Sequence, residues 1–129
     1  MKNIILNEYL ARHTSWKVGG PAEIFFTPEN RSELSKFLES NDKDITWIGN
    51  GTNVLVRDGG VRGVVISTKK SLAKIELVEE SICRVDAGTS CFELAMFATK
   101  NGFGPAAFFF RNTWVNWRSA DNECRLFWS

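Results

Sequence analysis

The stretch "WIGNGTNVLVRDGG", residues 47–60, carries the strongest local signal in the sequence. A β-prone run leads into the turn-forming residues 49–53, and the apolar run "NVLVR" follows, so a tight turn between two strands is predicted. Glycines let a backbone approach a ligand, and consecutive amide groups can cradle a phosphate. A β-turn without a ligand is the alternative, and both interpretations stay open at this point.

The turn matches neither of two common phosphate-binding patterns. It lacks the Gly-Lys-Ser/Thr of a Walker loop, and a strand is expected where a G-x-G-x-x-G motif would open a helix. The hydroxyl of its threonine and the amide of its second asparagine add neutral hydrogen-bonding groups. The candidate ligand-binding residues of this turn are Gly49, Asn50, Gly51, Thr52 and Asn53.

Two other glycine-containing connections are candidates for the same kind of site. In "HTSWKVGGPAEIFF", residues 13–26, a Gly-Gly-Pro turn precedes a strand. In "VDAGTSCFELAMFATKNGFG", residues 85–104, a strand ends and a capped helix opens, and its free N–H groups favour anions. Each is also compatible with an ordinary structural connection, and His13 alone is more typical of a surface or capping histidine than of a catalyst. Their candidate residues are Thr14, Lys17, Gly19, Gly20, Gly88, Thr89 and Ser90.

Short β-prone runs surround these connections. Strands are expected within residues 22–28, 45–49, 53–57 and 63–67, and residues 75–80 and 81–88 alternate like a hairpin. Several short strands close together favour an α+β fold with antiparallel pairs over pure βαβ winding.

Two helices are expected between the strands. The first covers residues 30–41, where Asn30 and Glu33 have capping-box spacing, and the second opens at Ser90 with Glu93. "NGFG" is expected to end the second helix. The apolar faces predicted from helical spacing are Leu34, Phe37 and Leu38 in the first, and Phe92, Ala95, Met96 and Thr99 in the second.

Composition excludes several classes of function. A net charge of +1 over 129 residues gives no reason to expect nucleic acid or a membrane surface as partner, and no apolar run approaches the roughly 18 residues of a membrane span. The three cysteines are unevenly spaced beside a single histidine, which argues against a metal site or disulfides and fits a reducing cytosol. No nucleophile–base set or carboxylate dyad is evident, so no catalytic residue is assigned.

Three stretches in order, "TSWKVGGPA", "IGNGTNVLVRDGGVRGVVI" and "DAGTSCFELAMFATKNGFG", resemble one family. It is UDP-N-acetylenolpyruvoylglucosamine reductase, or UDP-N-acetylmuramate dehydrogenase, and the likeness covers about residues 10–109. The resemblance implies the N-terminal portion of an FAD-binding domain of the vanillyl-alcohol-oxidase (PCMH) type. Residues 49–53 would hold the FAD pyrophosphate, and residues 14–20 and 88–90 would line the cofactor cleft.

The resemblance also implies a cytoplasmic reaction of peptidoglycan synthesis. In the family, NADPH reduces the flavin, which passes hydride to the enolpyruvyl group of UDP-N-acetylglucosamine enolpyruvate. A serine, an arginine and a glutamate assist that step. Family members are longer than this chain, and none of these three residues has a counterpart in it.

The end of the chain departs from the family. After "NGFG" the family has a phrase like GIPG-x-x-GGA-x-x-MNAG, whereas the chain reads "PAAFFFRNTWVNWRSADNECRLFWS". Suitable codons from Phe108 onward, read with one T removed from the phenylalanine run, give F-F-S-G-I-P-G-S-I-G-G-A-L-T-M-N-A. Trp114 before Val115 must yield glycine in that frame whatever codons are used. We therefore expect residues 1–109 to be a partial FAD-binding domain and residues 110–129 to be an out-of-frame tail.

Three interpretations of the chain follow. It is a truncated, inactive form of the reductase, or a stand-alone FAD- or nucleotide-binding module, or a non-functional pseudogene product. Binding of FAD is expected to be weak or absent in each case, because the segment that covers the flavin ring is missing. Self-association through exposed apolar surface is also expected.

Overall fold

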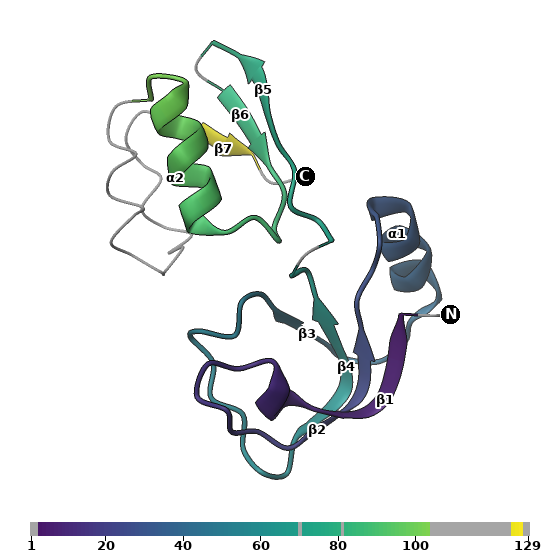
Figure 1. The fold of residues 1–129 in the computed structure, drawn as a ribbon. Coiled ribbons are helices and arrows are strands. Elements are labelled where there is room, and N and C mark those ends of the chain that lie inside the picture. The colour runs from purple at the N-terminus through teal and green to yellow at the C-terminus, as the bar shows by residue number, and fades with distance from the viewer. Residues whose placement is uncertain (1–2, 70, 81, 104–124, 128–129) are drawn as a thin grey trace. The chain divides into compact units, whose positions relative to one another are not determined.

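A computed structural model describes residues 3–69, 71–80, 82–103 and 125–127 (Figure 1). The chain divides into two compact units, Met1–Leu72 and Ala73–Ser129.

The first unit contains a four-stranded mixed sheet in the order β1-β2-β4-β3. β1 pairs antiparallel with β2, whereas β2 and β3 both run parallel to β4. The mixture of parallel and antiparallel strands with flanking helices confirms the α+β prediction. The elements are β1 (Ile4–Tyr9), the 3₁₀ turn η1 (Leu10–Arg12), β2 (Pro21–Phe26), α1 (Arg31–Ser40), β3 (Ile45–Ile48) and β4 (Val61–Ser67).

The two central strands of this sheet are buried on both faces. Phe26 on β2 and Ile66 on β4 pack with Phe37 of α1 on one face. On the other face Phe25 and Val65 form a second cluster. Strands covered on both sides are apolar at successive positions, and "IFF" and "VVI" show that pattern.

The N-terminus of α1 modifies the expected capping box. Asn30 Oδ1 accepts a hydrogen bond from the Glu33 N–H at 2.9 Å, as the sequence predicts. The Glu33 carboxylate, however, accepts from the N–H of Glu29 (2.7 Å) and from the side chain of Asn3 (3.1 Å). Glu33 thereby ties the helix to the residue that precedes β1. The predicted apolar face of Leu34, Phe37 and Leu38 is confirmed.

The strand predicted at residues 53–57 is wrong. These residues belong to the long connection from β3 to β4, and no strand forms there. Because β3 and β4 are parallel, the chain must return to the other end of the sheet, which a hairpin turn cannot achieve. Within "NVLVR", Val56 is buried and Val54 and Leu55 are exposed, so the segment contributes one core side chain without joining the sheet.

The second unit consists of a three-stranded sheet and one helix. β5 (Ile75–Glu79) and β6 (Ile82–Val85) form the predicted antiparallel hairpin, and β7 (Arg125–Phe127) pairs parallel with β6. β7 lies within the predicted out-of-frame tail, and the rest of that tail is outside the described residues. α2 (Cys91–Lys100) is the helix of this unit (Figure 1). Its Leu94 packs with Cys83 and Val85 of β6.

Both ends of α2 match the sequence prediction. Ser90 and Glu93 form a complete capping box. At the other end Gly102 has φ 76°, and the Phe103 N–H donates to the Ala98 carbonyl at 2.9 Å, which closes a Schellman motif.

The predicted apolar face of α2 is wrong in part. Leu94, Ala95 and Ala98 are buried, whereas Phe92 is 62% and Met96 51% exposed, and Thr99 is exposed. Apolar residues occur all around this helix, so two different stripes fit the helical period. Leu94 packs with Cys83 and Val85 of β6, and Ala98, four residues further along the helix, is buried as well.

Candidate functional site

The candidate site of the first unit is the connection of residues 49–60. Of its first five residues only Gly51 is buried. Among the described residues, the backbone N–H groups of Asn50, Thr52 and Asn53 have no hydrogen-bond acceptor. A Cβ built on Gly49 would meet no atom within 4 Å. Apart from the buried Gly51, the first residues of the connection therefore present N–H donors without acceptors in the described part of the chain, and open space beside the backbone of Gly49.

Gly51 joins this connection to residues 13–15. Its carbonyl accepts hydrogen bonds from the Ser15 N–H (2.9 Å) and the Ser15 hydroxyl (3.3 Å). Gly51 has φ 66°, and a Cβ there would lie 1.8 Å from the His13 carbonyl oxygen. Only glycine fits such a position. Two of the three predicted stretches are thus in direct contact.

Residues 14–18 form a turn held by Thr14. The buried Thr14 hydroxyl donates to the Val18 carbonyl at 3.0 Å, and the Thr14 carbonyl accepts from the Lys17 N–H at 3.3 Å. Lys17 is exposed and has φ 58°, a left-handed conformation that is costly for a residue with a Cβ. The Thr14 side chain is therefore committed to its own turn, and Lys17 supplies an exposed cation.

The predicted residues Gly19 and Gly20 bind the end of the connection. The Gly20 N–H donates to the Arg57 carbonyl at 3.0 Å. A Cβ on Gly20 would lie 2.0 Å from the Asp58 carbonyl oxygen, and one on Gly19 would lie 3.0 Å from Cβ of Val56. Both glycines are required for close backbone packing, which fixes the two loops side by side.

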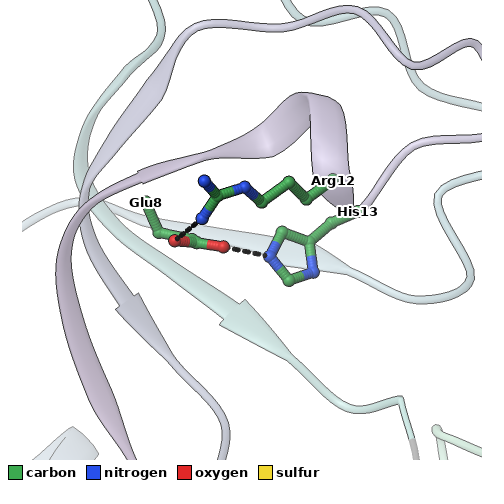
Figure 2. Close-up of polar contacts among 3 residues, drawn as sticks. All are labelled: Glu8, Arg12 and His13. Carbon is green, nitrogen blue, oxygen red and sulfur yellow. Dashed lines mark hydrogen bonds and ion pairs between the residues drawn. The ribbon is translucent and has the colours of Figure 1, made fainter.

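A polar cluster supports the start of the 13–20 loop (Figure 2). Glu8 lies between the side chains of Arg12 and His13 in Figure 2: its Oε1 is 2.9 Å from His13 Nε2 and its Oε2 is 3.3 Å from Arg12 Nη1. The His13 ring also stacks on Phe25 with a centroid distance of 4.2 Å. His13 therefore contributes both a polar contact and ring packing to the start of this loop. The sequence interpretation missed Glu8, because Glu8 lies on strand β1 and Arg12 on the 3₁₀ turn, so the helical four-residue rule gives no signal here.

The third predicted stretch lies in the second unit. The Ser90 hydroxyl accepts from the Glu93 N–H at 3.2 Å and is 2.8 Å from the Glu93 carboxylate. The Ser90 N–H, and then its hydroxyl, hold the pKa of Glu93 below the ordinary value. The Thr89 hydroxyl oxygen is buried without a partner among the described residues. Gly88 is half-buried beside it.

Two classes of site find no support in the part of the chain that the structure describes. It contains no group of three or more histidine, cysteine or acidic side chains that could hold a metal ion. None of its helices is long and apolar enough to cross a membrane.

Comparison with known proteins identifies the class. The family described as "FAD binding domain" matches residues 22–109. The chain therefore belongs to the FAD-binding domain family, and this agrees with the mixed sheet and flanking helices.

The particular relatives are enzymes of one name. The chain is 39% identical over 107 residues to UDP-N-acetylenolpyruvoylglucosamine reductase of Legionella pneumophila (strain Paris), covering 81% of this chain and 35% of that protein. It is 44% identical over 104 residues to the reductase of Methylococcus capsulatus, covering 79% and 34%. The resemblance seen in the sequence is confirmed. The chain spans about a third of the length of these curated relatives.

A solved structure agrees with the sequence relatives. The crystal structure of UDP-N-acetylenolpyruvylglucosamine reductase from Thermus caldophilus aligns with a TM-score of 0.52 and 31% identity. The alignment covers 77% of this chain and 33% of that structure. The fold class predicted from sequence, the N-terminal portion of a PCMH-type FAD-binding domain, is confirmed by this neighbour and by the family match.

Proposed function

We propose that this chain is the N-terminal part of an NADPH-using flavoprotein reductase. Its reaction converts UDP-N-acetylglucosamine enolpyruvate to UDP-N-acetylmuramate during peptidoglycan synthesis in the cytoplasm. The support is the shared sequence of the chain with relatives that carry the reductase name. The contribution of this part is to bind FAD, and bound FAD would supply the hydride-transfer chemistry.

The observation that carries this proposal is the open connection after β3. The N–H groups of Asn50, Thr52 and Asn53 lack acceptors among the described residues, and donors of that kind suit the oxygens of a pyrophosphate. Lys17, on the neighbouring loop, would add a positive charge. Gly49 would let the ligand approach the backbone closely, because no Cβ stands there. Gly88, Thr89 and Ser90, which belong to the second unit, are proposed separately as FAD-binding residues.

We expect binding without turnover from this chain. The catalytic serine, arginine and glutamate of the family have no assigned counterpart among the described residues. The polar pyrophosphate contacts are represented, whereas tight binding of FAD also requires apolar enclosure of its ring. Weak FAD binding and no FAD-dependent oxidation of NADPH are therefore the expected results.

A pair of glycine variants tests the site. Gly49 and Gly59 both have open space where a Cβ would be added, so Gly49→Ala and Gly59→Ala should fold equally well. FAD is titrated into each protein while flavin fluorescence is followed. We expect Gly49→Ala to weaken FAD binding several-fold, because the new methyl group stands where the ligand approaches, and Gly59→Ala to bind like the wild type.

Two results would overturn the proposal. Wild-type chain that leaves flavin fluorescence unchanged at saturating FAD does not bind the cofactor. Equal affinities of the Gly49→Ala and Gly59→Ala variants would place any binding elsewhere. Circular dichroism of both variants checks that their fold is retained.

A further inference from the structure

Ser15 holds the carbonyl of Gly51 with two donors, its backbone N–H and its hydroxyl. The two residues are 36 positions apart in the sequence. Gly51 itself is buried, but Thr52 and Ser15 are exposed, so this contact lies at the surface end of the loop pair.

Because the peptide bond is planar, this contact also determines the direction in which the Thr52 N–H points. The carbonyl of Gly51 and the N–H of Thr52 belong to one planar unit, and the structure contains no cis peptide among its described residues. In a trans peptide these two groups point in opposite directions. Because the Gly51 oxygen points towards Ser15, the Thr52 N–H points away from the 13–20 loop. That N–H has no acceptor within the described residues.

We propose that Ser15 is a positioning residue for the FAD site: it fixes the Gly51–Thr52 peptide so that the Thr52 N–H faces the anionic part of the ligand. The proposal rests on the proposed function, because it assumes that residues 49–53 bind the FAD pyrophosphate. Ser15 need not touch the ligand. Without its hydroxyl this peptide can rotate more freely, and the ordering of the amide must then occur on binding, which lowers affinity.

The test compares two side chains of the same shape. Ser15→Thr keeps the hydroxyl and Ser15→Val replaces it with a methyl group, and the exposed position accommodates both. FAD affinity is measured by flavin fluorescence, and the Thr52 amide resonance is followed by NMR during the titration. Ser35→Ala, which removes an exposed serine hydroxyl from α1, is the matched control.

We expect Ser15→Val to bind FAD roughly three- to tenfold more weakly than Ser15→Thr, the effect of one neutral hydrogen bond. Ser15→Thr and Ser35→Ala should bind like the wild type. The Thr52 amide should shift on addition of FAD in the wild type and in Ser15→Thr, and less in Ser15→Val. If Ser15→Val fails to fold, Ser15→Ala takes its place in the comparison.

The possible failures are distinguishable. Equal affinities of the threonine and valine variants, in a protein that binds FAD, overturn the role of Ser15 and leave the proposed function standing. A weaker valine variant whose Thr52 amide shifts as in the wild type also overturns it, because the effect then arises elsewhere. A wild-type chain that binds no FAD overturns the proposed function and this inference with it.

Discussion

Gly51 is the residue at which the two loops of the candidate site meet. Its φ of 66° lies in the left-handed region, and an added Cβ would lie 1.8 Å from the carbonyl oxygen of His13, a backbone atom. Backbone strain and overpacking act together at this position.

Gly51→Ala is therefore expected to reduce the free energy of unfolding by about 2–4 kcal/mol. Chemical denaturation followed by circular dichroism measures the change. Gly59→Ala is the control, since its Cβ would meet open space, and it should change stability by less than about 0.5 kcal/mol. Equal stability of the two variants would contradict the packing described for the loops.

Glu23 binds the bulge between β2 and β4. The pairing of these strands shifts between Ala22 and Ile24, and the Gly63 N–H at the shift donates to Glu23 Oε2 at 2.8 Å. The other carboxylate oxygen pairs with Lys43. The Lys43 ammonium, followed by the Gly63 N–H, lowers the pKa of Glu23.

The lowered pKa of Glu23 determines how the stability of the fold depends on pH. A carboxyl group whose pKa is lower in the folded state stabilises the fold fully above its ordinary pKa of 4.5, and the stabilisation is lost as the pH falls through the folded pKa. We expect wild type to melt above Glu23→Gln at pH 7 and the difference to disappear in acid. Melting curves across that range measure it. A difference independent of pH would show that charge is not the cause.

At the scale of one helix, the ends of α2 could be predicted from sequence patterns, whereas its buried face could not. Its start and end were predicted correctly, because a capping box and a Schellman glycine are local arrangements of a few neighbouring residues. Its buried face was not, because the choice between two apolar stripes depends on which side the sheet of the second unit covers.

Two substitutions on α2 check the corrected face. Leu94→Ala removes a buried side chain that packs with Cys83 and Val85, and it should cost about 2–5 kcal/mol of stability. Met96→Ala removes a side chain that is half exposed and should cost clearly less, about 1 kcal/mol or below. Urea denaturation gives the free energy of unfolding of both variants and shows whether the face with Leu94 or the face with Met96 is buried. A larger loss for Met96→Ala would restore the face predicted from sequence.

The connection after β3 shows a second limit at the scale of elements. The sequence predicts a ligand-binding connection at residues 49–53 because its glycines and small polar residues are local features, and ligand binding there stays a prediction. It could not show that the next strand is parallel, nor that Ser15 contacts Gly51 across 36 positions. Those features arise from pairings between distant segments, which a local pattern does not contain.

At the scale of the whole molecule, apolar surface is the feature that governs behaviour in solution. β1 forms an edge of the four-stranded sheet and exposes Leu6 by 67% and Ile5 by 48%. Edge strands with apolar side chains favour pairing with other chains.

We expect the chain to associate as its concentration rises, and Leu6→Lys to reduce this association. Met96→Lys is the matched control, because it introduces the same charge at another exposed apolar residue that is on a helix and not on a sheet edge. Sedimentation velocity over a range of concentrations gives the result. A wild-type chain that stays monomeric throughout would contradict the prediction, and an equal effect of both lysines would exclude the edge as the cause.

The first unit is made of one continuous stretch of the chain, and this affects when it can fold during synthesis of the protein. All four of its strands lie between Ile4 and Ser67, and the unit ends at Leu72. β1 and β2 are close in sequence and can pair early. The pairing of β2 with β4 can form only after β4 has been synthesised, because Ala22 pairs with the distant Val61. Once β4 has left the ribosome, Ser15 and Gly51 can meet. The loop pair of the candidate site can therefore be complete while later residues are still being translated.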